Sequence, residues 1–289
     1  ASCLVGSEMC IRDSMRIDAH VHMMGKECRR EKFLENLKEA GMDGAVVFSP
    51  SPGNMFGRNG DYRERIERVI EFTKGEEMLI PFFFVDPTEE NALKQMQDAV
   101  SAGVKGFKII CSHFYPGNEE AMKAYEWIAG QNMPLMFHSG ILYDGINVSG
   151  KYNRPCEFEP LLGVANLRFS LAHVSWPWTD ECIAVYGKFD SYKKREPSGE
   201  AASMYLDLTP GTPPSYREGM LTHLMGNDFR VEDTVFWGSD NSVENYDSSY
   251  VRKWVERDCE IYRKLGLTEE RKNKIYYDNF MAFLNGTGR

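Results

Sequence analysis

Short apolar runs, rich in β-branched and aromatic residues, alternate with longer amphipathic stretches from Met15 to the end of the chain. The short runs have the length and composition of buried strands, since strands of a parallel sheet are covered on both faces and are apolar throughout. Eight segments are predicted as strands: 16–22, 44–49, 78–85, 104–110, 134–138, 167–173, 204–208 and 234–238.

The stretches between these runs have the periodicity of helices with one buried face. Helices are predicted at 31–40, 62–74, 89–102 and 119–129. In the first of them Phe33, Leu34 and Leu37 lie on one side and charged residues lie elsewhere, as in the outer helix of a barrel. Gly41 and Gly103 follow two of the segments and are typical helix-stop residues.

Eight alternations of strand and helix predict a parallel sheet closed into a (β/α)8 TIM barrel, with a metal site at its C-terminal mouth. The barrel is expected to be a single domain over residues 15–289. A doubly wound open sheet is the main alternative, but no GxGxxG motif follows the first strand. The polar stretch 186–202 is predicted to be a surface loop before the seventh strand.

Residues 1–14 do not share this pattern. They lack the apolar core and small-residue cleavage site of a secretory signal. Residues 8–14 resemble an in-frame translation of a transposase adapter used in sequencing libraries. We therefore expect a non-native or disordered extension, with the natural chain beginning at Met15.

Composition narrows the class of partner. The 289 residues carry a formal charge of −9, which disfavours binding to nucleic-acid backbones. No apolar run approaches the roughly 18 residues that a membrane-spanning helix needs, so no membrane partner is expected. The 7 cysteines are scattered without a CxxC pair, which indicates a reducing, cytoplasmic setting rather than a disulfide framework.

The histidines fall at strand ends. Of the 6 in the chain, His20 and His22 end the first predicted strand, and residues two apart point to the same side of a strand. His138 ends the fifth strand and His173 ends the sixth. Asp240 follows the eighth strand.

The carboxyl ends of barrel strands meet at one face, so these side chains are expected to lie together. Imidazole and carboxylate ligands suit one divalent metal ion, with zinc as the first expectation and manganese or iron as alternatives. Such a metal lowers the pKa of bound water, and a nearby carboxylate or imidazole takes the proton. One HxH pair or one strand-end histidine is weak evidence, because structural histidines are common, but the combination favours a metal site.

The chain resembles the amidohydrolase superfamily, in the branch that includes aminocarboxymuconate-semialdehyde decarboxylase and lactonases. The motifs span nearly the whole chain from Met15 and are specific for the superfamily, but they do not name a substrate. They are DAHVH at 18–22, GVKGFKI at 103–109, FHSG at 137–140, LAHVSWPW at 171–178, WGSDN at 237–241 and IYYDNFMAFLNG at 275–286.

The resemblance implies roles for the matching residues. His20, His22 and His138 would bind the metal. Asp240 would be a further ligand and would accept a proton from metal-bound water. His173 matches a position that serves as a second-site ligand, a general base or an electrophile, and we favour a catalytic role.

Four further residues are predicted substrate contacts. Lys108 has three open roles: a carbamylated bridge between metals, a partner for a substrate carboxylate, or a structural cation. We favour carboxylate pairing, because the residues that follow suggest that Lys108 lies deep in its strand. Arg154 is expected to clamp a carboxylate, with a solvated loop charge as the alternative. Trp176 and Trp178 are expected to wall a planar substrate or to pack within their loop.

The function favoured is metal-dependent hydrolysis of a small carboxylated lactone, amide or related carbonyl compound by metal-bound hydroxide. Non-oxidative decarboxylation or hydration of an aromatic or unsaturated acid uses the same groups and is the closest alternative. A TatD-type nuclease and a non-catalytic barrel are minor alternatives. Barrels of this kind often pair through outer helices, and we expect a homodimer or a larger homo-oligomer.

Overall fold

The fold is described from a computed structural model, over residues 14–25, 28–53, 61–145, 148–229 and 231–287. Within these residues a 9-stranded sheet has the order β8-β7-β6-β5-β4-β3-β2-β1-β9, and every pair of neighbours is parallel. The strands are β1 Ile17–His22, β2 Gly44–Phe48, β3 Leu79–Phe84, β4 Gly106–Ile109, β5 Pro134–Phe137, β6 Arg168–Leu171, β7 Ser203–Asp207, β8 Val235–Phe236 and β9 Asn241–Ser242.

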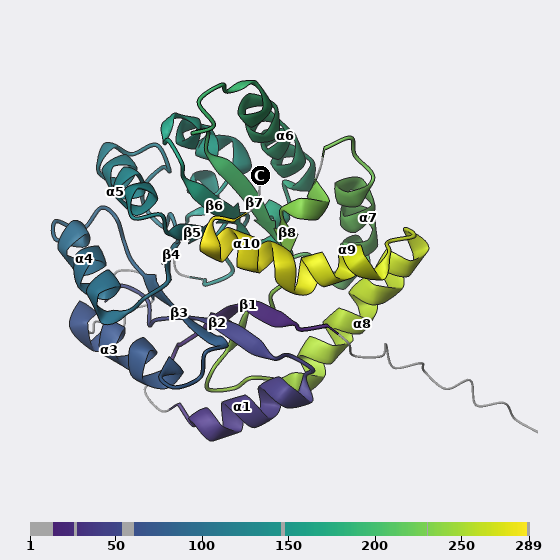
Figure 1. Ribbon diagram of the computed structural model, residues 1–289, viewed down its shortest axis with the longest axis horizontal. Helices are drawn as coiled ribbons and strands as arrows, with labels where there is room; N and C mark the ends of the chain where they lie inside the picture. The colour runs from purple at the N-terminus through teal and green to yellow at the C-terminus, as the bar shows by residue number, and fades with distance from the viewer. Residues whose placement is uncertain (1–13, 26–27, 54–60, 146–147, 230, 288–289) are drawn as a thin grey trace, which may run out of the picture.

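The helices surround the curled sheet, as Figure 1 shows. Within the described residues the α-helices are α1 Arg30–Glu39, α3 Tyr62–Thr73, α4 Ala92–Ala102, α5 Glu119–Gly130, α6 Thr179–Arg195, α7 Pro214–Met225, α8 Ser248–Lys264, α9 Glu269–Asn273 and α10 Asn279–Asn285. Short 3-10 segments include η1 Gly150–Tyr152, η2 Pro155–Gly163, η3 Ala172–Ser175 and η4 Val231–Asp233, and η5 Lys274–Asp278 is a π-helical turn before α10.

All eight predicted strands are present, and the prediction of a parallel sheet with helices between its strands is confirmed. Each strand from β1 to β7 pairs with the next one along the chain. A doubly wound sheet reverses its strand order at a switch point, and this sheet does not, so the alternative is excluded.

The segment after β7 contacts both edges of the sheet. Its first part, β8, pairs with β7, and its second part, β9, pairs with β1. Between these pairings the Ala19 amide donates to the Trp237 carbonyl at 3.1 Å, and the Asp240 amide donates to the His20 carbonyl at 2.9 Å. These bonds hold Asp240 beside the end of β1.

Two apolar cores lie on opposite faces of the strands, because successive side chains of a strand point to opposite faces. The larger core, between strands and helices, includes Val47, Phe83 and Phe107. The inner core consists of Ile17, Ala19, Val46, Phe48, Ile80, Phe82, Met136, Tyr205 and Phe236 with Phe280 and Phe283. The last two belong to α10, which lies across the strands in Figure 1. This helix covers the inner core at the N-terminal ends of the strands.

The prediction of a surface loop over 186–202 is wrong for residues 186–195, because α6 continues to Arg195, and only 196–202 connect this helix to β7 without helix or strand. Cys182, Tyr186 and Phe189 are spaced four and three residues apart and are buried on one face of this helix. The basic residues that made the stretch look loop-like occupy the last turn of α6, where positive charge favours the helix C-terminus.

Two sequence-based expectations concern cysteines and membranes. The described cysteines, Cys28, Cys111, Cys156, Cys182 and Cys259, form no disulfide, as predicted. None of the helices in the described ranges has the length and apolar character to cross a membrane. The expectation of a non-native extension falls on residues that lie, apart from Ser14, outside the described ranges.

Candidate metal centre

A bulge in β1 turns both histidines of the HxH pair toward the inside of the sheet. Asp18 pairs with Ala45 and Val21 pairs with Val47, so three steps along β1 oppose two along β2. Ala19 accordingly belongs to the inner core, whereas Val21 belongs to the outer one. Such a bulge re-aims side chains next to active sites.

His20, His22 and Asp240 form a compact group of potential ligands. His20 Nε2 lies 3.1 Å from His22 Nε2. Asp240 Oδ1 lies 3.5 Å from His20 Nε2 and 3.3 Å from His22 Nε2. One ligand atom from each residue lies within 4.8 Å of the others, so three of the four predicted ligands are brought together.

His138, the fourth predicted ligand, follows β5 directly and packs against His173 with ring centroids 5.0 Å apart. His173 is in turn 5.7 Å from the His20 ring. The Nε2 atom of His138 is buried and has no hydrogen-bond partner among the residues that the structure describes. A buried nitrogen left unpaired is costly, and a metal bond is one way of satisfying it, so the residues present fit a metal.

The electrostatics of the group suit metal binding. Burial, assisted by Lys108, holds the pKa of His20 well below its ordinary value, and burial does the same to the pKa of His138. Neutral imidazoles are the form that binds a metal. Burial raises the pKa of Asp240, but the hydrogen bond from His22 and the neighbouring imidazoles outweigh it and hold the pKa below its usual range. Asp240 is therefore anionic, the state in which a carboxylate can bind a metal.

His173 lies in a strained turn at the end of β6. Its backbone is left-handed, with φ 61° and ψ 14°, and the next two residues also have positive φ. Non-glycine residues rarely adopt this conformation, and where they do it often marks a functional site. Its Nδ1 lies 3.3 Å from the Thr209 carbonyl oxygen, so the Nδ1–H donates there and Nε2 is the ring nitrogen left for chemistry.

Glycine at position 211 makes room for this imidazole. A Cβ at Gly211 would lie 2.7 Å from both Cγ and Nδ1 of His173. The loop after β7 therefore packs directly on the ring and fixes its place.

Sequence reasoning missed Asp207, the last residue of β7. Its Oδ2 lies 2.6 Å from His20 Nδ1, while its Oδ1 accepts hydrogen bonds from the amide and the hydroxyl of Thr209. A carboxylate in this relation fixes the tautomer and orientation of a metal-binding histidine. Burial raises the pKa of Asp207 to about 6, although the hydrogen bonds from Thr209 act to lower it. The available signal was an acidic residue at the end of the seventh predicted strand.

Asp18 was also missed, although it belongs to the DAHVH motif. It is fully buried, and it accepts hydrogen bonds at 2.8 Å from the Ser239 amide and from the Tyr246 hydroxyl. Asp18 thus ties β1 to the segment that carries Asp240.

Lys108 faces the inside of the sheet, because its neighbours Phe107 and Ile109 belong to the outer core. Its Nζ lies 3.4 Å from His20 Nε2 and 5.0 Å from the Phe48 ring centroid. Lys108 is fully buried, which agrees with the expectation that it lies deep in its strand, and its amine still reaches a predicted metal ligand. Its role as a carboxylate anchor or as a carbamylated bridge stays a prediction. Burial lowers the pKa of Lys108 to about 8.

The other predicted substrate contacts lie in the segments that follow β5 and β6. Arg154 is half-exposed and forms an ion pair with Glu181 at 2.8 Å. Its guanidinium carbon lies 5.7 Å from the ring centroid of Trp178, at the start of α6. Trp176 directly follows the turn that carries His173, and its amide donates to the His173 carbonyl at 3.1 Å. The roles of these residues as substrate contacts stay predictions.

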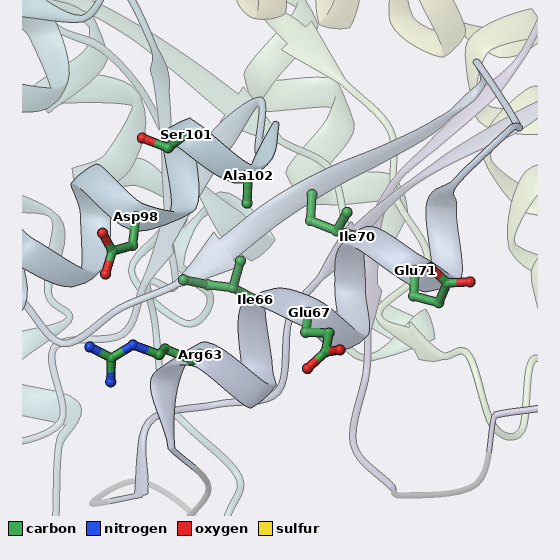
Figure 2. Close-up of a pocket in the computed structure, with 8 residues that line it drawn as sticks. All are labelled: Arg63, Ile66, Glu67, Ile70, Glu71, Asp98, Ser101 and Ala102. Atoms are coloured by element: carbon green, nitrogen blue, oxygen red, sulfur yellow. The ribbon is translucent and has the colours of Figure 1, made fainter.

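A groove of about 540 Å³ lies elsewhere, on the outer surface between α3 and α4 (Figure 2). It has an apolar floor and a charged rim, and it is lined by Arg63, Ile66, Glu67, Ile70, Glu71, Asp98, Ser101 and Ala102. None of the predicted site residues lines it. The candidate site is therefore the histidine group, and this groove is separate from it.

The amidohydrolase family model matches residues 17–285, and the chain belongs to the amidohydrolase family. The resemblance inferred from the motifs is thereby confirmed, and the protein is an enzyme of the metal-dependent hydrolase and lyase class. A comparison with curated proteins finds no significant match.

Solved structures share the fold at low sequence identity. An uncharacterised TIM-barrel protein from Bordetella bronchiseptica has a TM-score of 0.69 at 16% identity, over 95% of this chain and 100% of that one. 2,6-Dihydroxybenzoate decarboxylase from Rhizobium has a TM-score of 0.61 at 12% identity, over 95% and 99%. 4-Oxalomesaconate hydratase from Rhodopseudomonas palustris has a TM-score of 0.62 at 14% identity, over 93% and 95%.

Proposed function

We propose that this protein hydrolyses a small carboxylated lactone, amide or related carbonyl compound, with one divalent metal ion. Zinc is the first candidate, and manganese and iron are the alternatives. The observation that carries the proposal is the grouping of His20, His22 and Asp240 within 4.8 Å, with the Lys108 amine adjacent. The proposal includes closure of the sheet into a (β/α)8 barrel through residues 235–242, with the site at its C-terminal mouth.

His20, His22, His138 and Asp240 would hold the metal. When bound, it supplies a Lewis acid that polarises a carbonyl group and makes water a stronger acid. The orphaned His138 Nε2 supports this ligand set, because it has no other use for its lone pair within the described residues.

Two residues would move the proton. Asp240 is ionised, and its side chain retains 37% exposure, so it can accept a proton from the attacking water. His173 presents Nε2, since its Nδ1–H is engaged by the Thr209 carbonyl. It would polarise the substrate carbonyl or deliver the proton to the leaving group.

Lys108 would bind the substrate carboxylate. No carboxylate of the described residues lies within ion-pair distance of its Nζ, which leaves the amine available inside a buried site. Arg154 has less support as a clamp, because Glu181 already satisfies it. Trp176 and Trp178 remain proposed contacts for a planar part of the substrate.

The proposal is tested by elemental mass spectrometry on the wild type and on His20→Ala, followed by turnover assays on lactones and carboxylated amides. We expect about one metal per chain, lost in the variant. His223→Ala is the matched control, since this exposed histidine on α7 pairs only with the surface residue Asp180 among the described residues. Absence of metal after reconstitution would refute the proposal.

Decarboxylation or hydration of an aromatic or unsaturated acid is the second candidate. It is favoured by the shared fold of the Rhizobium decarboxylase and the Rhodopseudomonas hydratase. The same metal, proton carrier and cationic anchor would serve both reactions. Release of carbon dioxide without ring opening would identify the decarboxylase.

We further propose that the protein is cytoplasmic and acts on a small molecule. We propose that it forms a homodimer or a larger homo-oligomer and binds neither nucleic acid nor membrane. The net charge of −9 and the absence of disulfides among the described cysteines support these choices.

A further inference from the structure

Tyr143, Trp176 and Tyr216 form a continuous aromatic rim. The Tyr143 and Trp176 rings are stacked, with centroids 6.3 Å apart and an interplanar angle of 24°. The Tyr216 ring lies on Trp176 at 6.1 Å and 57°. Tyr143 is 72% exposed and Tyr216 is 61% exposed, so both tyrosines keep most of their surface available. Contiguous exposed aromatic surface marks a binding site more often than single exposed residues do.

The rim comes from segments that follow three strands of the metal centre, with Tyr216 in the first turn of α7. Its three residues follow β5, β6 and β7, the strands that carry His138, His173 and Asp207 at their ends. Trp176 is tied to this region by the hydrogen bond that its backbone amide donates to the His173 carbonyl. Its own carbonyl accepts from the Ile141 amide at 3.1 Å. The rim residue Trp176 is thus held directly beside the turn that carries His173.

A second apolar surface lies at the ends of β3 and β4. Phe84 and Ile110 are buried there, and Leu142 packs against them. Phe84 is the register partner of Lys108, so this surface adjoins the buried amine. Leu142 immediately precedes Tyr143, and the loop after β5 thus contributes to both surfaces.

We propose that the rim binds the planar ring of an aryl carboxylic acid derivative, whose carboxylate is held by Lys108. The inference rests on the proposed function and narrows its substrate from carboxylated compounds in general to aromatic ones. Aromatic side chains favour a flat aromatic ring over a saturated ring of the same size, because the contact between two aromatic rings is more favourable than burial of the same apolar area alone. The exposed ring faces of Tyr143 and Tyr216 would contact the substrate ring and so determine this preference for aromatic over saturated rings.

The test compares two probes of the same carbon skeleton, naphthalene-2-carboxylate and decahydronaphthalene-2-carboxylate, by calorimetric titration of the metal-loaded protein. We expect the wild type to bind the aromatic acid up to about tenfold more tightly. The double variant Tyr143→Ala/Tyr216→Ala should lose this preference. Tyr143→Phe/Tyr216→Phe should retain it, because the ring and not the hydroxyl makes the contact.

Tyr192→Ala is the matched control, since this tyrosine on α6 is 38% exposed and lies outside the rim. Equal binding of the two acids by the wild type, or an unchanged ratio in the double alanine variant, would overturn the inference.

The proposed function is judged separately, from metal content and turnover. If the double alanine variant loses the ring preference but keeps its metal and its turnover of an aliphatic substrate, the rim is supported. If the wild type is metal-free and inactive but still prefers the aromatic acid, only the proposed hydrolase function is refuted.

Discussion

His20 Nδ1 and Asp207 Oδ2 lie 2.6 Å apart, and both side chains are fully buried. The contact leaves His20 Nε2 directed at His22 and Asp240, where a metal would bind. The carboxylate that ends β7 thus determines which nitrogen of the β1 histidine is available.

Asp207→Asn should weaken metal binding by about 10- to 100-fold, because an amide orients the imidazole less firmly and makes it a weaker base. Competition with a fluorescent chelator measures the affinity. Asp190→Asn is the control, since Asp190 is a buried aspartate on α6 that pairs with Lys194. Equal metal affinity in the two variants would exclude an orienting role for Asp207.

Gly211→Ala should lower kcat by at least about tenfold, since a misplaced catalytic group loses its alignment. The added Cβ would lie 2.7 Å from the His173 ring, and the ring would have to move. Metal content should stay unchanged, because His173 is not in the proposed ligand set. Gly219→Ala is the control, as nothing lies within 4 Å of the Cβ built there. Metal loss in Gly211→Ala would instead assign His173 to the metal.

Lys108→Met should retain the metal and raise KM for carboxylated substrates, while turnover of the matching methyl ester is little changed. The reason is the loss of the amine that adjoins His20 Nε2. Steady-state kinetics on each acid and its ester measure the difference. Parallel reconstitution with and without bicarbonate separates the anchor from a carbamylated bridge, because only the bridge makes activity depend on bicarbonate.

Arg217→Met should destabilise the fold by about 3–5 kcal/mol, since it leaves Asp258 charged, buried and without its main partner. Arg217 donates from Nε at 2.8 Å and from Nη2 at 2.6 Å to this carboxylate, and also to the Leu208 carbonyl at 2.7 Å. Denaturant unfolding measures the change. The exposed pair of Arg271 and Glu232 provides the control, and Arg271→Met should cost about 1 kcal/mol or less.

Chelation should lower the melting temperature of the wild type, because a ligand that binds only the folded state stabilises it, by about 2.7 kcal/mol at a hundredfold excess over Kd. His20→Ala should melt at the same temperature with and without chelator. Differential scanning fluorimetry measures both. A chelator-induced shift that persists in the variant would place the stabilising metal elsewhere.

Alternation of apolar and amphipathic segments was sufficient to predict the eight strands and the parallel sheet. The signal was strong because each strand is buried on both faces and each helix on one, so burial is recorded directly in residue type. The same logic failed at α6, whose last turn is basic and whose buried residues include Gly187 and Asp190. The sequence indicated a loop there, although spacing within Cys182, Tyr186 and Phe189 suited a helix.

The candidate site was likewise predictable from the sequence only in part. The placement of His20, His22 and Asp240 at strand ends was readable from the sequence, since parallel strands bring their carboxyl ends to one edge. The sequence alone showed that the two histidines share a side, but not which side. A bulge between Asp18 and Val21 decided that, and it depends on how β1 pairs with its neighbour.

Contacts between residues remote in the chain were decided only by the tertiary structure. Asp207 meets His20 across 187 positions, and Tyr143 from the loop after β5 and Tyr216 from helix α7 meet at Trp176. Residue type and local spacing determine which elements form, because those depend on neighbours in sequence. The partner of a buried carboxylate or an exposed ring depends on distances in space, which are fixed when the sheet curls and its loops pack.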